Sequence, residues 1–219
     1  MRRFDRRHHF LALGLASLAG LVDALGFLRL GGLFVSFMSG NTTRMAVDGV
    51  ERTPQFALAA GLIGAFVGGV VLGAVVSRLT DNWRMSIVLS TTTILLLLAS
   101  ACTVVPPVLV VAPFLMAAAM GAVNNVLVQD GEVAVGVTYM TGALVKIGQH
   151  IAAALCGGPC FAWLPYLLLW MSLVAGAATG ALLFPPLGLK ALWVASGYAI
   201  VLLACTVAQE RSRLGRPSV

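Results

Sequence analysis

Apolar runs of about 20 residues follow one another along almost the whole chain, and they limit the folds open to it. About 20 apolar residues let a helix cross a bilayer, where helices are favoured because they satisfy their own backbone hydrogen bonds. Of the 219 residues, 59% are hydrophobic and 10% are charged. Soluble domains carry roughly 25% charged residues. The sequence therefore predicts an all-α polytopic membrane protein in contact with the lipid bilayer.

Glycines, prolines and charged residues divide the chain into eight segments. The predicted helical segments are 10–28, a short one ending at residue 48, 55–76, 85–105, 108–128, 133–155, 161–184 and 189–207. Shifting the first four by 102 positions places them on the last four. We expect a basic N-terminus at 1–9, a first membrane repeat at 10–105, a second at 106–208 and a basic tail at 209–219.

A short pattern marks the same place in both repeats. Residues 35–40 read Val-Ser-Phe-Met-Ser-Gly, and residues 137–142 read Val-Thr-Tyr-Met-Thr-Gly. Each copy interrupts an apolar segment. Duplicated units with matched interrupted segments are typical of secondary transporters, whose broken helices form a site near the middle of the membrane. We therefore expect two homologous halves, each with three full spans and one short, interrupted half-helix segment.

The number of crossings decides how the repeats are related. If the motif segments do not cross the bilayer, six spans result and the repeats are inverted. If they do cross, eight spans result and the repeats are parallel. Both arrangements keep the two basic termini in the cytoplasm, and the positive-inside rule favours six. The formal charge of +6 comes largely from these termini, and beside apolar spans it indicates anchoring rather than nucleic-acid binding.

The motif can start a helix in each half. Ser39 and Thr141 are predicted N-caps of short helices, because a serine or threonine hydroxyl can accept from first-turn N–H groups. Two such helix N-termini would present partial positive charge to the protein interior and attract an anion or a carboxylate. Arg44 and Lys146, about 7 Å further along at 1.5 Å per residue, could add to the same field.

Polar residues also occur inside the preceding spans. A gap-free alignment pairs Asp23 with Asn125, and Asn124 lies beside it. A charge at a helix centre costs at least ~2.5 kcal/mol and should face a partner or a wet cavity. Asp23 either pairs with Arg44 or Lys146 as a structural bridge, or carries a proton or cation. The two asparagines either bond between helices or serve the site.

The remaining candidates have similar alternatives. His150 has a pKa suited to proton coupling, or is structural. The aromatic pair Phe37 and Tyr139 lines a pocket or packs in the core. Asp23 is the other proton-coupling candidate. The predicted substrate-binding residues are Asp23, Ser36, Phe37, Ser39, Gly40, Asn41, Thr42, Arg44, Asn124, Asn125, Thr138, Tyr139, Thr141, Gly142 and Lys146.

Two stretches resemble the signatures of a known family. Residues 20–27 and 31–42 are similar to the G-x-x-D-A-x-x-F and G-G-x-F-V-S-x-M-T-G-N-T elements of the DUF1275 family, also called YoaK-like or UPF0700. Residues 121–125 and 138–142 resemble its second signature, an Asn/Gln-containing span followed by T-x-x-T-G. Ser39 and Asn124 are mild departures. The resemblance covers nearly the whole chain and implies a bacterial inner-membrane protein without an established activity.

The sequence therefore favours a transporter of a small solute, anionic or carboxylate-bearing, bound between the two motif copies. A channel or a scaffold protein without transport is the alternative, and a homo-oligomer is compatible with either. A membrane enzyme is less favoured, because we find no metal-ligand cluster, nucleophile elbow or paired carboxylates. The four cysteines lack zinc-site spacing, and no cofactor or metal is expected.

Overall fold

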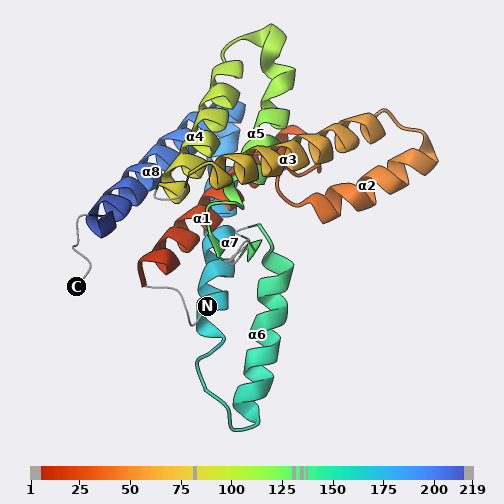
Figure 1. The fold of residues 1–219 in the computed structure, drawn as a ribbon. Coiled ribbons are helices and arrows are strands. Elements are labelled where there is room, and N and C mark those ends of the chain that lie inside the picture. Colours follow the sequence, from red (N-terminus) through yellow and green to blue (C-terminus); the bar gives the residue numbers. More distant parts are fainter. Residues whose placement is uncertain (1–5, 81–82, 130–131, 134–135, 137, 215–219) are drawn as a thin grey trace.

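A computed structural model describes the chain except residues 1–5, 81–82, 130–131, 134–135, 137 and 215–219. Eight α-helices make up most of this described part (Figure 1). They are α1 (Arg6–Arg29), α2 (Met38–Glu51), α3 (Gln55–Arg78), α4 (Arg84–Cys102), α5 (Ala112–Val123), α6 (Met140–Leu155), α7 (Leu164–Leu187) and α8 (Leu192–Leu214). Two 3₁₀ helices, η1 (Pro106–Val111) and η2 (Gly188–Ala191), and two short paired strands, β1 (Val128–Gln129) and β2 (Glu132–Val133), complete it.

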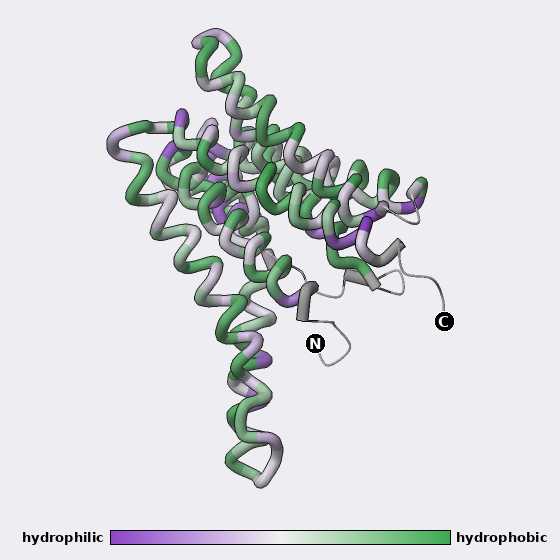
Figure 2. The backbone as a smooth tube through the Cα atoms, turned by 90° about the vertical axis from the view of Figure 1, so that its left-hand side faces the viewer, coloured by the Kyte–Doolittle hydropathy of each residue, from purple (hydrophilic) through white to green (hydrophobic). Residues whose placement is uncertain are grey.

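The prediction of an all-helical membrane protein is confirmed. Within the described residues, five helical segments are long and apolar enough to cross a membrane. The last of them, Leu164–Ser212, has 49 residues and contains both α7 and α8, each long enough for one crossing. Apolar residues line most of the helices, and hydrophilic ones form short patches (Figure 2). The chain is a multi-pass membrane protein whose exposed apolar side chains contact lipid.

The bounds of several predicted segments are wrong. The segment predicted at 133–155 is helical only from Met140, and Val133 lies in β2. The segment predicted at 108–128 ends as a helix at Val123, and β1 begins at Val128. The prolines expected to end the segment at 184 lie inside α7, which continues to Leu187. The chain turns instead at Gly188, whose φ of 55° is in the left-handed region that favours glycine.

The helix pairs define the direction of each helix. The starts of α1 and α7 lie together, with His9 near Pro165, and so do their later parts, with Gly20 against Leu173. These two helices are therefore parallel. In the same way α3 is parallel to α5, while Ser100–Ser196 and Ser86–Glu210 hydrogen bonds make α4 antiparallel to α8. The helices α4 and α5 form a hairpin (Figure 1).

The two halves repeat the same contacts. A Cβ atom on Gly69 of α3 would lie 1.9 Å from the carbonyl oxygen of Ala118 on α5. A Cβ atom on Gly176 of α7 would lie 1.9 Å from the carbonyl oxygen of Ser17 on α1. Glycines at these crossings allow the backbones to approach closely, which is how membrane helices associate without a hydrophobic drive between them. The α3–α5 and α7–α1 pairs are therefore structural equivalents.

These contacts correct the gap-free alignment of the halves. Gly20 on α1 faces the carbonyl oxygen of Leu173, and Gly121 on α5 faces that of Phe66, at 2.1 and 2.0 Å from an added Cβ. Gly20 and Gly121 are 101 positions apart, so the structural equivalent of Asp23 is Asn124 and not Asn125. The second half has one more residue between this span and its motif.

Glu210 joins the end of α8 to the start of α4. Its buried carboxylate accepts hydrogen bonds from the backbone N–H groups of Met85 and Ser86, at 3.1 and 3.2 Å, and from the Ser86 hydroxyl. It therefore satisfies first-turn donors of α4, and its negative charge lies at the positive end of that helix.

Replacing Glu210 with alanine should lower the unfolding free energy by about 2–3 kcal/mol, because the α4 donors lose their acceptor. Thermal unfolding in detergent measures this change. The exposed neighbour Arg211→Ala is the control and should change stability little. Equal midpoints for the two variants would contradict the capping role.

Candidate functional site

A carboxylate holds the first motif segment against α1. After α1 the chain turns through Gly31 and Gly32, both at positive φ, and comes back along the helix. The Oδ1 atom of Asp23, six residues before the end of α1, accepts hydrogen bonds from the N–H groups of Val35 and Ser36, both at 2.8 Å. The segment before α2 is therefore re-entrant, and Asp23 satisfies its backbone.

Asn41 supports the same segment from α2. Its Oδ1 accepts from the Phe34 N–H at 2.8 Å, and its Nδ2 donates to the Phe34 carbonyl at 2.6 Å. The side chain is fully buried. Its counterpart in the second motif copy is Ala143, which cannot make these bonds. Asn41 is thus a support specific to the first half.

The second half uses one amide, that of Asn124, in place of the carboxylate. Asn124 accepts a hydrogen bond from the Thr138 hydroxyl at 3.1 Å and donates to the Met120 carbonyl at 2.9 Å. Thr138 is the equivalent of Ser36 in the motif. Asn125 instead donates to the carbonyl of Val70 on α3, at 3.1 Å. The interhelical bonding predicted for the asparagines is therefore observed at Asn125, while Asn124 braces the motif segment.

The short helices begin earlier than predicted. Phe37 and Tyr139 are the N-cap residues of α2 and α6, with similar backbone angles, and neither makes a side-chain capping bond. The prediction that Ser39 and Thr141 are N-caps is wrong, because both lie in the first turn. A helix N-terminus still lies at each motif copy, because α2 and α6 have equivalent first turns whose N–H groups lack partners within the helix.

Both motif copies line one pocket of about 250 Å³. Its serine and threonine residues are Ser36, Ser39, Thr138 and Thr141, two from each copy. Its other lining residues are Phe37, Met38, Phe66, Tyr139, Met140 and Gly142. None of these described lining residues is charged. The pocket therefore combines hydroxyl groups and two helix N-termini with apolar walls, which suits a small solute that offers hydrogen-bond acceptors.

The cationic candidates lie elsewhere. Arg44 is half exposed and approaches Asp48 of its own helix, with Nε and Oδ2 4.0 Å apart. Lys146 lies over the Tyr166 ring of α7, with its Nζ 5.3 Å from the ring centroid. Neither lies at Asp23, which bonds to backbone, so the predicted bridge is wrong. Neither lines the pocket, so neither contacts a solute bound there.

His150 stacks on the same tyrosine. The His150 and Tyr166 ring centroids are 5.3 Å apart, and the ring planes are nearly parallel, with an angle of 18° between them. His150 thus packs between α6 and α7, away from the residues that line the pocket. The exposed Thr42 donates to the Met38 carbonyl, and an added Cβ on Gly40 would meet the Phe37 ring at 2.6 Å.

The structure therefore brings together about half of the predicted site. The predicted residues that line the pocket are Ser36, Phe37, Ser39, Thr138, Tyr139, Thr141 and Gly142. Asp23, Asn41 and Asn124 hold the motif segments behind it. The prediction missed Met38 and Met140, which their place in the motif copies could have indicated. It also missed Phe66, which looks like any other apolar residue of α3.

Comparison with known proteins agrees with this architecture. Residues 11–205 match the family model described as "Protein of unknown function (DUF1275)". The chain belongs to this family. One relative is the UPF0700 transmembrane protein RA0705 of Rhizobium meliloti (strain 1021), 36% identical over 212 residues that cover 93% of this chain and 89% of the relative. No solved structure matches the chain. The resemblance read from the motif residues is confirmed.

Proposed function

We propose that this DUF1275 chain is a secondary transporter, not an enzyme, for a small anionic or carboxylate-bearing solute. The observation that carries the proposal is the pocket shared by the two motif copies, one from each half. Transporters place their substrate between repeats, where discontinuous helices direct N-termini at anionic groups. The first turns of α2 and α6 and the hydroxyls of Ser39 and Thr141 supply donors of this kind, while the Thr138 hydroxyl already donates to Asn124.

The directions of the helices support a six-span inverted repeat. With α1 and α7 parallel, α3 and α5 parallel, and α4 and α8 antiparallel, equivalent helices of the two halves run in opposite directions. The helices α2 and α6, of 14 and 16 residues, are shorter than the about 20 residues that a crossing needs. Each half then consists of three full spans and one half-helix.

In this topology the basic residues of the two termini decide the orientation. The end of the bundle where α1 starts carries the basic residues at the ends of α3, α4 and α8, namely Arg78, Arg84 and Arg211. The other end has Arg29, Arg52 and Lys190. With the arginines of both termini added, the positive-inside rule places the first end and both termini in the cytoplasm. We propose the bacterial inner membrane as the location.

Filling the pocket should stop transport without unfolding the protein. An added Cβ on Gly142 would meet nothing within 4 Å, although the residue lines the pocket. Gly142→Leu should therefore place a side chain in the solute's space and reduce uptake at least about tenfold. Uptake into proteoliposomes is measured with radiolabelled chloride, formate, acetate, lactate and inorganic phosphate.

Gly148→Leu is the matched control. It lies on the same helix, also has nothing within 4 Å of an added Cβ, and does not line the pocket. Its uptake and thermal midpoint should equal those of the wild type. Equal uptake by the Gly142 variant would refute the site. If wild-type vesicles take up none of the five anions, the proposed anionic class of solute is refuted. If the protein gives single-channel currents, it is a channel and not a transporter.

A further inference from the structure

We propose that a hydrophobic organic cation, of the quaternary ammonium or phosphonium type, binds between α1 and α7 beside Asp23. A groove of about 610 Å³ lies there, within the range of about 300–1,000 Å³ that is usual for small-molecule sites. It shares no lining residue with the motif pocket, and the proposal is independent of transport. The groove is lined by Gly20, Asp23, Ala24, Phe27, Leu28, Phe34, Leu173, Val174, Ala177, Ala178 and Ala181. Asp23 has the one polar side chain among them.

Small residues leave the space for this groove. The α1 and α7 backbones touch at Gly20 and Gly176. Beside this line of contact α7 presents three alanines, whose side chains are too short to fill the space. Two aromatic rings form another wall, Phe27 of α1 and Phe34 of the re-entrant segment, with centroids 4.9 Å apart. Asn41 bonds to both backbone groups of Phe34 and so fixes the position of this wall.

The carboxylate in the groove lacks a counter-charge. Asp23 accepts hydrogen bonds from the N–H groups of Val35 and Ser36, both at 2.8 Å, and from the Ser36 hydroxyl. All these donors are neutral. Among the residues that the structure describes, no lysine or arginine forms an ion pair with Asp23. An ionisable group inside a membrane span is costly and marks a site whose partner should carry the opposite charge.

The walls of the groove select the kind of cation. An inorganic cation would have to exchange its water shell for hydrocarbon, and no group of three possible metal ligands occurs in the described part of the chain. An acyl chain would match the walls but would leave the carboxylate unpaired. A cation with a hydrocarbon surface pairs with Asp23, packs on the alanines and gains cation–π attraction from Phe27 and Phe34.

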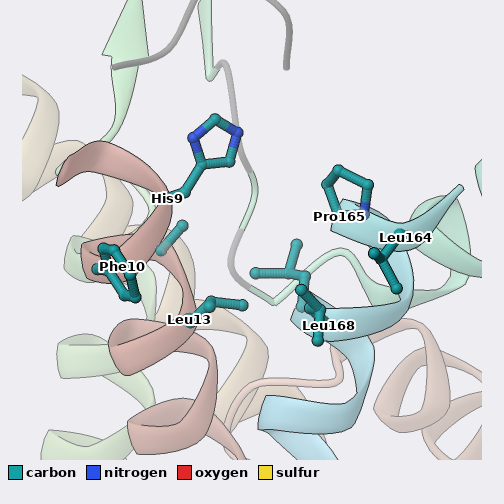
Figure 3. A pocket seen from close by; sticks show the side chains of 8 residues that line it. His9, Phe10, Leu13, Leu164, Pro165 and Leu168 are labelled. Carbon is teal, nitrogen blue, oxygen red and sulfur yellow. The ribbon is translucent and has the colours of Figure 1, made fainter. Parts of the chain in front are cut away.

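A smaller pocket between the same two helices provides a comparison. It lies at the starts of α1 and α7, has a volume of about 260 Å³, and is lined by His9 and hydrocarbon side chains. Leu13 and Leu168 approach from opposite sides, and His9 lies at its upper end (Figure 3). No carboxylate lines this pocket. Apolar compounds that enter it therefore meet no group that prefers a cation.

Equilibrium dialysis of the full chain in detergent tests the proposal, with protein-free micelles as the background. The probes, measured separately, are tetraphenylphosphonium and tetraphenylborate, which carry the same four phenyl groups and opposite charges. The wild type should bind tetraphenylphosphonium at least about tenfold more tightly than tetraphenylborate. Asp23→Asn keeps an acceptor for the two N–H groups but removes the charge, so it should weaken tetraphenylphosphonium binding at least about tenfold.

Ala178→Trp fills the groove from α7 and should weaken tetraphenylphosphonium binding about tenfold. Ala175→Trp is the matched control, because Ala175 is exposed on the same helix and does not line the groove. Leu168→Trp fills the pocket at the helix starts. Both controls should bind as the wild type does.

Equal wild-type affinities for the two ions would overturn the proposal, as would unchanged binding in Asp23→Asn or Ala178→Trp. Loss of binding in either control would place the cation elsewhere and would also overturn it. If Asp23→Asn unfolds in a thermal scan, the comparison of the two ions and the tryptophan variants decide the question without it.

Discussion

Gly69→Ala should destabilise the protein severely, while Gly68→Ala, one residue away, should leave it unchanged or slightly more stable. A Cβ atom on Gly69 would lie 1.9 Å from the carbonyl oxygen and 2.6 Å from the carbonyl carbon of Ala118. Backbone atoms cannot rotate away as a side chain can, so α3 and α5 would have to separate along their contact. We expect a loss of about 3 kcal/mol or more, at the upper end of overpacking effects.

The neighbouring glycine makes the test specific. An added Cβ on Gly68 meets nothing within 4 Å, and alanine is the better helix former by up to about 1 kcal/mol. The unfolding midpoints of both variants in one detergent measure the difference. Because Gly176 makes the equivalent contact with Ser17, Gly176→Ala should behave like Gly69→Ala. Similar midpoints for the Gly68 and Gly69 variants would show that α3 and α5 do not pack as described.

The contrast between these two glycines shows why the fold could be read from the sequence only in part. Apolar length and spacing predicted the helices. Nothing in the sequence distinguishes Gly68, which is exposed, from Gly69, which is buried. That difference depends on the rotation of α3 against α5, which partner helices determine.

The site shows the same limit in its details. The motif copies and their shared pocket follow from the duplication, but a gap-free comparison selected the wrong asparagine. The donor in the motif lies 13 positions after Asp23 and 14 positions after Asn124, because the second loop is longer by one residue. A one-residue insertion in a loop costs little and leaves a weak trace in a single sequence. The matching of Gly20 with Gly121 was the available signal.

The positions of the Arg44 and Lys146 side chains were predicted wrongly for a related reason. Rise per residue gives the distance of Arg44 and Lys146 from the helix starts, but not the face of the helix on which they lie. Asp48 on α2 and Tyr166 on α7 attract them away from the pocket. Arg44→Ala should therefore affect transport much less than a substitution that fills the pocket.

Asp23→Ala should cost about 2–4 kcal/mol of unfolding free energy, because two backbone donors lose their acceptor and each such loss costs ~1–3 kcal/mol. The donors are the N–H groups of Val35 and Ser36, which lead into the first copy of the motif. The re-entrant segment would lose its attachment to α1, and the pocket would lose the wall that Ser36 forms. Uptake should fall with stability.

Asp23→Asn distinguishes a brace from a proton carrier. Asparagine keeps an oxygen that can accept both N–H bonds and removes the titratable carboxyl. In the second half an asparagine, Asn124, stands at the equivalent position and accepts from the Thr138 hydroxyl. If Asp23 acts through the backbone of the motif segment, this variant should keep most of the wild-type stability and uptake. Asn124→Ala is the matched comparison and should cost less than Asp23→Ala, because the Thr138 hydroxyl can turn to another acceptor. A stable Asp23→Asn protein without proton-driven uptake would show instead that the carboxyl carries the coupling proton.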